Sequence, residues 1–387
     1  MSHQRNSVVY GITVGISALT LLRGQLAWLR EHGWDVHLAV TPDSQAHKAA
    51  DRERVTLEPL PMTRNISPKA DLVALTAWVR LLVRVKPAAV NVSTPKAGLL
   101  GGLAAFATRV PRRVYVLRGL RLEGASGVLA KVLWAIERLT VATATDVVVV
   151  SPSLAADAHA RRLLPVRKRV WLIGEGSSNG VPAAAVQAAA TPQARRQLRD
   201  ELSLADDDMV VGYVGRITVD KGVATLLDAM AALPGDARVK LLAIGSIDDA
   251  PLAGRLDALG DRIVHVDWVD DPWRYYAAMD VLCLPTRREG FPNVVLEAAA
   301  AGLPTVTTRA TGAVDSVVDQ VTGYLVDVED SPALQQALAA LATTPSLRTK
   351  MGEAARDRVE RQFQPELIWA GVASLLAGQP GPDVHRL

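Results

Sequence analysis

The chain has 387 residues, of which 49% are hydrophobic and 21% charged, so its composition excludes a disordered protein and leaves room for two globular domains. Its only cysteine, Cys283, excludes an internal disulfide and indicates a reducing compartment such as the cytoplasm. The net charge of +3 conceals an asymmetry, because residues 1–185 contain 24 Lys and Arg against 12 Asp and Glu, whereas the remainder contains 19 against 28. We therefore expect the first half to bind an anionic partner, namely a membrane surface, a phosphorylated lipid or nucleic acid.

Short β-rich runs alternate with Ala- and Leu-rich helical stretches in the first half of the chain. Arg5 and the apolar run at 8–22 resemble a secretion signal, but Arg23 interrupts the run and no cleavage site follows promptly, so we expect a strand and a helix there. The predicted strands are 8–13, 35–40, 89–92, 113–117, 146–150 and 170–173, with helices at 19–32, 69–85, 97–107, 126–143 and 152–163. No apolar run has the length of a transmembrane helix. This alternation predicts a parallel, doubly wound α/β sheet.

The same alternation restarts after a change of composition near 180–190, where Pro182 precedes an Ala-rich stretch. We expect a first domain at 1–185, a second at 186–364, and a C-terminal helical segment at about 365–387 that packs back on the first. The second domain is predicted to have strands at 209–214, 239–244, 263–266, 281–284, 305–307 and 323–326, and helices at 192–202, 221–232, 251–259, 272–279, 293–302, 312–319 and 331–362. Two such domains leave a cleft, and ligands bind these sheets outside the carboxyl ends of the strands.

The first motif is GRITVDKG at 215–222, between a predicted strand and a predicted helix. A strand end, a Gly turn and a helix start form an anion site, because free backbone N–H groups point outwards there. Arg216 and Lys221 add two cations, which together stabilise the charge that grows on a departing diphosphate. A surface loop with solvated charges is the alternative, since the spacing matches neither a Walker loop nor G-x-G-x-x-G.

The second motif is RREGFPNVVLE at 287–297, which also follows a predicted strand and opens a predicted helix. Gly290 and Asn293 suit a tight turn and an N-cap. Glu289 lies in the loop and Glu297 inside the helix, and a carboxylate beside a helix start accepts two hydrogen bonds from a ribose diol. Because a buried carboxylate needs a partner, a structural pairing of Glu297 with an Arg or a helix end is the alternative.

These two motifs resemble those of a known family. Glu289 and Glu297 form E-x7-E inside EGFPNVVLEAAAAGLPTV, which resembles the signature of the family-four retaining glycosyltransferases, and GRITVDKG resembles the diphosphate loop of the same family. In the first half, LLRGQLAWLREHGWDVHL, MTRNISPKADL, STPKAGLLG, LRGLRLEG and GSSNGV resemble capsular and exopolysaccharide glycosyltransferases, which look like enzymes that extend a sugar on a polyprenyl-diphosphate carrier. The resemblance covers about residues 8–365. It implies the GT-B fold (two Rossmann-like domains facing across a cleft), no metal, and retention at the anomeric carbon.

The resemblance also implies roles for individual residues. Arg216 and Lys221 would hold the donor diphosphate, and Glu297 would hold the ribose hydroxyls. Glu289 would contact the transferred sugar in a front-face mechanism, in which the leaving phosphate helps to deprotonate the acceptor, so that Arg216, Lys221 and Glu289 form the catalytic set. A nucleophilic role for Glu289 stays open. The remaining implied donor-binding residues are Gly15, which would let the first domain's backbone approach the donor, and Gly215, Gly290, Phe291, Pro292, Asn293 and Val294.

The chain departs from the family at two positions. Arg118 stands where many members have a His near the donor sugar, and Pro182 stands where an Asp commonly follows Asn-Gly-Val. Arg118 is therefore a candidate for binding a phosphate of the donor or the acceptor. The other candidates for a lipid diphosphate are Arg64, Lys96 and Arg121, and each is alternatively a solvated charge.

No residue pattern indicates a metal site. The acidic runs 206–208 and 248–249 are interpreted as solvated turns, and the seven His lack metal-ligand spacing. Arg80, Arg84 and Lys86 lie on a predicted helix with a Leu/Val face, which suits either an interfacial surface or an ordinary amphipathic core helix.

The sequence therefore predicts a metal-independent, retaining transferase. It would move an N-acetylhexosamine or hexose from a UDP-sugar to a polyprenyl-diphosphate-linked saccharide in cell-surface polysaccharide synthesis. We expect it in the cytoplasm, on the inner face of the cell membrane through its basic first domain. The alternatives are GDP-mannose as donor, a soluble acceptor such as a sugar phosphate or natural product, a GT-B epimerase, and a non-catalytic nucleotide-sugar-binding protein. Nucleic acid is disfavoured, because the basic residues are not interleaved with aromatics.

Overall fold

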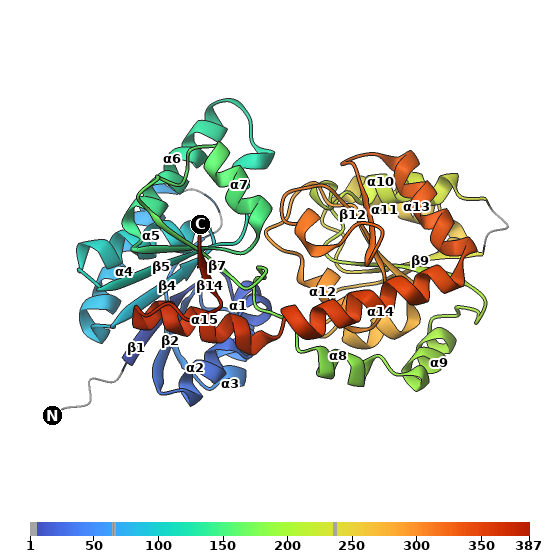
Figure 1. The fold of residues 1–387 in the computed structure, drawn as a ribbon. Coiled ribbons are helices and arrows are strands. Elements are labelled where there is room, and N and C mark those ends of the chain that lie inside the picture. Colours follow the sequence, from blue (N-terminus) through green and yellow to red (C-terminus); the bar gives the residue numbers. More distant parts are fainter. Residues whose placement is uncertain (1–5, 64, 66, 235–237) are drawn as a thin grey trace. The chain divides into compact units, whose positions relative to one another are not determined.

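The computed structural model describes residues 6–63, 65, 67–234 and 238–387. It divides into two compact units, the first formed by Met1–Asn179 with Pro365–Leu387 and the second by Gly180–Gln364. The chain therefore leaves the first unit at Asn179, slightly before the expected boundary at residue 185, and returns to it at Pro365. In each unit, helices flank a central sheet (Figure 1).

The first unit contains an eight-stranded sheet in the order β14-β7-β6-β5-β4-β1-β2-β3. All neighbours are parallel except β14, which pairs antiparallel with β7 at the sheet edge. Runs of Val, Leu and Ile lie buried in the central strands, as expected when helices cover both faces of a parallel sheet. The strands are β1 (Asn6–Gly11), β2 (Trp34–Val40), β3 (Thr56–Pro59), β4 (Ala89–Ser93), β5 (Arg112–Leu117), β6 (Asp146–Val149), β7 (Arg169–Ile173) and β14 (Val384–Arg386).

The helices of the first unit follow the predicted ranges except at 19–32, and α3 and the short η1 were not predicted. The helix expected at 19–32 is two helices, because the buried carboxylate of Glu53 accepts hydrogen bonds from the backbone N–H groups of Gly24 (3.0 Å) and Ala27 (3.1 Å) and so caps a new helix start. The last helix, α15, packs on α2 and on strands β4, β5 and β7. The helices are α1 (Gly15–Leu21), α2 (Gln25–Glu31), α3 (Ser44–Glu53), α4 (Pro68–Val85), α5 (Pro95–Ala107), η1 (Arg121–Gly124), α6 (Gly127–Thr143), α7 (Pro152–Ala160) and α15 (Pro365–Ala377).

The second unit contains a six-stranded parallel sheet in the order β10-β9-β8-β11-β12-β13. The chain runs outwards from β8 to β10 and then crosses back to β11 on the other side of β8, so the strand order reverses between β8 and β11. Ligands of open α/β sheets bind at such a reversal. The predicted two-domain doubly wound α/β fold is thereby confirmed. The strands are β8 (Met209–Val214), β9 (Val239–Ile244), β10 (Ile263–Val266), β11 (Val281–Leu284), β12 (Thr305–Thr308) and β13 (Gly323–Val326).

The second unit departs from the predicted helices at several positions. The helix expected at 272–279 is the 3₁₀ helix η4, and α8 forms where only a change of composition was noted. The helix expected at 331–362 is two helices, because Pro345 starts a new one where its missing N–H is not needed. The helix expected at 312–319 is only the short turn η5 (Val314–Ser316). The helices are α8 (Ala183–Ala189), α9 (Pro192–Glu201), η2 (Val219–Lys221), α10 (Val223–Ala232), α11 (Ala250–Asp257), η3 (Gly260–Arg262), η4 (Trp273–Ala278), α12 (Asn293–Ala300), α13 (Ser331–Thr343) and α14 (Pro345–Gln362).

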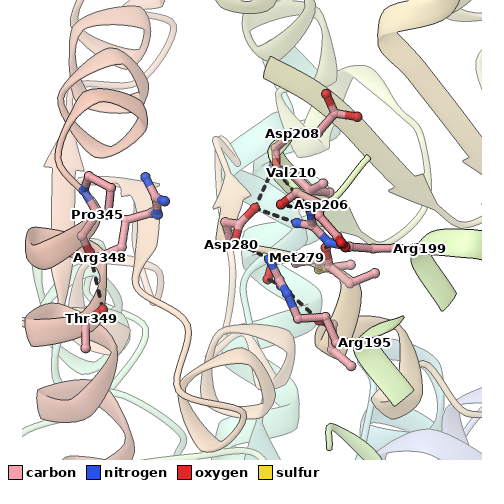
Figure 2. A network of polar contacts seen from close by, with 12 residues as sticks. Arg195, Arg199, Asp206, Asp208, Val210, Met279, Asp280, Pro345, Arg348 and Thr349 are labelled. Carbon is pink, nitrogen blue, oxygen red and sulfur yellow. Dashed lines mark hydrogen bonds and ion pairs between the residues drawn. The ribbon is translucent and has the colours of Figure 1, made fainter. Parts of the chain in front are cut away.

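A buried ion cluster fastens α9 to the sheet of the second unit (Figure 2). The Arg199 side chain is 1% exposed, and its guanidinium contacts Asp280 at 2.8 Å and the carbonyl oxygens of Ala205, Asp206 and Asp208. Asp280 also accepts from Arg195 at 2.8 Å and from the backbone N–H of Val210 at 2.7 Å. Because every charge is paired and hydrogen-bonded, the cluster fixes the entrances to β8 and β11 without leaving an uncompensated buried ion.

Candidate active site

The two sequence motifs lie side by side at the carboxyl edge of the second sheet. The loop 215–222 follows β8 and the loop 285–292 follows β11, and these two strands are hydrogen-bonded neighbours at the reversal of strand order. Gly222 has a φ of +69°, and a Cβ there would lie 1.8 Å from the carbonyl oxygen of Pro285. Only glycine permits the two loops to approach this closely.

The loop after β9 binds the loop after β8 through two carboxylates. Asp249 accepts a hydrogen bond from the backbone N–H of Val219 at 2.6 Å, and Asp248 contacts the guanidinium of Arg216 at 3.0 Å. Asp248 is exposed and Asp249 half-exposed, in keeping with the predicted solvated turn, and both carboxylates also bind the neighbouring loop. The Arg216 side chain remains 60% exposed, so its guanidinium is open to an incoming anion.

A buried hydroxyl also fixes the backbone of this loop. Tyr213, at the end of β8, donates its hydroxyl hydrogen to the carbonyl oxygen of Arg216 at 2.6 Å. Burial, and then the negative charge of Glu289, raise the pKa of Tyr213, so the hydroxyl keeps its proton and stays a donor. The turn carrying Arg216 is thus set by the strand below it.

Lys221 and Glu289 form an ion pair across the two loops. The Lys221 Nζ contacts Glu289 Oε1, and the two side chains are only 25% and 14% exposed. A second bridge runs parallel to the first, from Arg288 to Asp220 at 2.5 Å, and the backbone N–H of Arg287 donates to the Asp220 carbonyl oxygen at 3.0 Å. The structure therefore brings the predicted cation and the predicted carboxylate together, and adds a supporting pair that the sequence did not reveal.

The start of α12 presents backbone groups beside this ion pair. Pro292 occupies the N-cap and Asn293 is the first helical residue, so the predicted N-cap at Asn293 is wrong by one position. The Oδ1 atom of Asn293 is buried and has no hydrogen-bond partner among the described residues. The ring centroids of Phe291 and Phe363 lie 5.5 Å apart, so the Phe291 side chain packs in the core of the unit. An unpaired acceptor beside a helix start is suited to a ligand hydroxyl.

Glu297 lies one turn into α12 and is half-buried. Its Oε2 accepts a hydrogen bond from the hydroxyl of Tyr276 at 2.8 Å, and that hydroxyl also lies 3.4 Å from the Val294 carbonyl oxygen. Burial, and then the charge of Glu297, raise the pKa of Tyr276 well above its usual value, so Tyr276 remains a proton donor. We expected a hydrogen-bond partner for the carboxylate of Glu297, and Tyr276 is one. Nothing in the sequence around Tyr276 indicated this contact.

Two candidates in the first unit, Gly15 and Lys96, follow β1 and β4, the strands at its own reversal of strand order. Gly15 begins α1, and its N–H donates to Asp43 at 3.2 Å, with the carboxylate standing where a Cβ would lie. The Thr13 hydroxyl bonds that of Thr94 at 2.7 Å, which ties the loop after β1 to the loop after β4. The contact with Asp43 therefore explains why a glycine stands at position 15, independently of the implied approach to a donor.

The predicted acceptor residues fall into different environments. The Lys96 ammonium contacts Asp71 at 2.5 Å and the Thr63 hydroxyl at 3.3 Å, and its side chain is 10% exposed, so it is neither a solvated charge nor open to an anion as it stands. Arg121 is exposed at the start of η1. Arg64 lies outside the described residues.

Arg118 is enclosed rather than solvated. Its Nη1 donates to the Ser178 carbonyl oxygen at 2.6 Å, and its Nε is buried without a hydrogen-bond partner among the described residues. Burial lowers the pKa of Arg118 to about 10, partly offset by Tyr10, so the guanidinium stays charged at neutral pH. It borders a cavity of about 10 Å³, also lined by Gln25 and Asn91, with room for about one water-sized sphere.

Comparison of the chain with known proteins identifies its family. Residues 208–344 match the model of the glycosyl transferases group 1, and residues 19–174 match the glycosyl transferase 4-like domain. The capsular polysaccharide biosynthesis glycosyltransferase CapM of Staphylococcus aureus is 36% identical over 377 residues, covering 96% of this chain and 97% of CapM. The chain therefore belongs to the family-four glycosyltransferases.

Solved structures of other proteins have the same fold as this glycosyltransferase. HepE of Anabaena, crystallised with UDP and glucose, superposes with a TM-score of 0.81 at 19% identity, covering 97% of this chain and all of HepE. Sucrose-phosphate synthase of Thermosynechococcus elongatus superposes with a TM-score of 0.78 at 22% identity, covering 97% and 99% of the two chains. Both confirm the GT-B fold predicted for the glycosyltransferase, and at these identities the likeness concerns the fold alone.

Proposed function

We propose that this glycosyltransferase moves a hexose or N-acetylhexosamine from a UDP-sugar to a polyprenyl-diphosphate-linked saccharide, in the synthesis of a cell-surface polysaccharide. The observation that carries the proposal is the contact of Lys221 with Glu289 between two loops at the strand-order reversal. The similarity to CapM, a capsular polysaccharide biosynthesis glycosyltransferase, supports a role in polysaccharide synthesis. The UDP and glucose bound by HepE support a UDP-sugar as the donor.

The donor diphosphate would lie over the loop 215–222. Arg216, exposed and already oriented by Asp248, would take one phosphate, and Lys221 would exchange part of its contact with Glu289 for another. Glu297, fixed by Tyr276, would accept hydrogen bonds from the ribose hydroxyls. Asn293 Oδ1 and the backbone of Gly290, Phe291 and Pro292 would contact the sugar.

The reaction would proceed on one face of the sugar. The bond between the anomeric carbon and the β-phosphate oxygen breaks while the acceptor hydroxyl oxygen bonds the same carbon, and the hydroxyl proton passes to the departing phosphate oxygen. Arg216 and Lys221 stabilise the charge that develops on this phosphate, so we propose that catalysis needs no metal. Glu289 would stabilise positive charge on the sugar ring and position Lys221. The product would retain the anomeric configuration of the donor.

Binding comes first in the test. UDP, GDP, ADP and their sugar conjugates are titrated into the purified protein in EDTA, followed by thermal unfolding. We expect a selective shift with UDP and one UDP-sugar. A GDP-selective shift would replace the UDP donor by a GDP-sugar, and no shift with any nucleotide would overturn the donor site.

Turnover is then measured with the selected donor and a polyprenyl-diphosphate-linked disaccharide. Lys221→Ala and Glu297→Ala should lose turnover while keeping the wild-type melting temperature. Lys240→Ala is the matched control and should retain turnover. Lys240 lies on β9, outside the two loops, and pairs with Asp261 of η3. Wild-type rates in both site variants would refute the site, and transfer to a sugar phosphate alone would refute the lipid-linked acceptor.

A further inference from the structure

Helix α6 of the first unit carries an apolar stripe on its solvent side. Val128, Val132 and Leu139 are 78%, 42% and 45% exposed, and Ala135 is exposed between them. Their spacing of four, three and four residues places them on one face of the helix. We call these four residues the α6 stripe. An exposed apolar stripe of this kind marks an interaction surface.

The opposite face of α6 packs in the core of the unit. Thr140 and Val141 are buried, and the buried carboxyl of Glu137 accepts a hydrogen bond from the hydroxyl of Tyr115 on β5 at 2.6 Å. The helix packs on α5, η1 and β5 through this face. The α6 stripe is therefore surplus to the fold of the unit, and its burial needs a surface outside it.

The exposed charges around the α6 stripe are mostly basic, with Glu123 of η1 half-buried. Lys131 is exposed and Arg138 half-exposed on the helix, and Arg121 is exposed in η1 just before it. The only acidic residue within Gly127–Thr143 is Glu137, whose carboxyl points into the unit. The surface that covers the stripe is therefore both apolar and anionic.

Trp134 adds a third feature. It lies on the flank of α6 that carries Lys131 and Arg138; its Nε1 donates to the carbonyl oxygen of Arg161 at 2.9 Å, and its side chain is 38% exposed. Tryptophan is enriched where an apolar layer meets water, and an interfacial helix combines apolar, basic and aromatic residues in this way.

We propose that the α6 stripe lies in the headgroup layer of an anionic lipid bilayer, with Lys131, Arg138 and Arg121 on the lipid phosphates. The proposal rests on the proposed function, because it names the surface that brings this transferase to a lipid-linked acceptor. A helix of 17 residues lies about 25 Å long in the membrane plane. Among the described residues no helix is long and apolar enough to cross a bilayer, so attachment through this face would be peripheral.

The structure favours α6 over the basic helix considered from the sequence. In α4, Trp78, Leu81 and Leu82 are buried and make it an ordinary core helix. Its exposed face carries Leu72, Val73 and Val83, but Thr76 and Arg80 are exposed between them and interrupt the apolar surface.

A single engineered cysteine tests the proposal directly. The native Cys283 is fully buried and burial raises its thiol pKa, so a thiol-reactive, environment-sensitive dye labels only the introduced site. In Val132→Cys we expect a blue shift of the dye with vesicles of phosphatidylcholine and phosphatidylglycerol, and about fivefold weaker binding for each of Lys131→Gln and Arg121→Gln. Val321→Cys, 51% exposed in the second unit, is the matched control and should show no shift.

A shift of Val132→Cys with protein concentration and without vesicles would show that a second copy covers the stripe and would overturn the proposal. No shift under either condition would overturn it as well. An equal response to pure phosphatidylcholine would remove the anionic part of the proposal.

A second variant separates this proposal from the proposed function. Val128→Asn with Val132→Asn should weaken vesicle binding at least about tenfold while leaving UDP binding and transfer to a water-soluble, short-chain acceptor unchanged. Transfer to the long-chain acceptor in vesicles should fall in parallel with binding. Unchanged vesicle transfer would refute the role of α6 and leave the transferase intact. Vesicle binding through α6 without transfer to any lipid-linked acceptor would refute the proposed function and leave the membrane face intact.

Discussion

The contact between Lys221 and Glu289 predicts opposite effects of one substitution on binding and on turnover. In Glu289→Gln the amide keeps the size of the side chain but removes the negative charge that holds the lysine. UDP, which lacks the sugar, should therefore bind more tightly to Glu289→Gln than to the wild type. Turnover of the UDP-sugar should fall, because the same carboxylate is proposed to support the sugar.

The size of the binding effect follows from the geometry. A phosphate oxygen that contacts Lys221 lies about two charge-assisted hydrogen bonds of about 2.8 Å from the carboxylate, or about 6 Å. Two unit charges at that separation repel by about 0.7 kcal/mol in water and about 3 kcal/mol at an effective dielectric constant of about 20. Because both side chains are partly exposed, we expect a value near 1.4 kcal/mol, which is a tenfold lower Kd for UDP.

Calorimetric titration of UDP at low ionic strength measures this effect. Lys221→Met should bind UDP more weakly, and Glu289→Gln should still tighten UDP binding in the Lys221→Met background, because the repulsion between carboxylate and phosphate does not require the lysine. Glu201→Gln is the matched control, because it breaks an exposed ion pair with Arg274 outside the two loops. A folded Glu289→Gln protein that binds UDP no more tightly than the wild type would show that the diphosphate does not meet Lys221.

Three further predictions concern positioning, stability and pH. Tyr276→Phe removes the hydroxyl that holds Glu297, so the KM for the donor should rise about tenfold with kcat nearly unchanged; equal losses in kcat and kcat/KM in steady-state kinetics would contradict this positioning role. Arg199→Met leaves Asp280 with Arg195 alone and should lower the free energy of unfolding by about 3 kcal/mol in urea, against about 1 kcal/mol for Arg195→Met; equal losses would show that burial of Arg199 does not matter. Burial raises the pKa of Glu137 to about 7, above its usual 4.5, so the folded protein binds the extra proton and stability should fall as pH rises from about 4.5 through 7, by about 3 kcal/mol in total. Glu137→Gln should abolish this dependence in thermal unfolding between pH 5 and pH 8, and an unchanged pH profile would exclude Glu137 as its source.

The sheet strands were predictable because their signal is local. The runs at 209–214, 239–244 and 281–284 are buried on both faces, and the structure reproduces their limits. β3 (Thr56–Pro59) and α3 (Ser44–Glu53) were missed, since β3 holds an acidic residue and a proline and α3 is largely polar. Their formation depends on partners elsewhere, such as Glu58 with His37 on β2, which no local window contains.

The sequence predicted where the candidate site lies on the sheet, but not which side chains contact one another there. Two motifs that follow neighbouring strands must meet at one sheet edge, and Lys221 and Glu289 do. Their supports come from segments whose own sequence is bland, as with Asp249 beneath the first loop and Tyr276 beneath Glu297. A carboxylate in a turn and a tyrosine in an aromatic run have many possible partners, and only tertiary packing selects one. The roles of these residues in donor binding stay predictions.

The return of the chain to the first unit affects how the protein folds during synthesis. Residues Gly180–Gln364 are continuous, so the second unit can complete its structure once they leave the ribosome. The first unit cannot, because α15 supplies the Trp369 indole that bonds Asn179 at 2.8 Å, and β14 covers the free edge of β7. The half of the protein made first is therefore the half finished last. Until β14 pairs, β7 remains an open edge that invites association with other chains, so a nascent or truncated chain has a specific place at which aggregation begins.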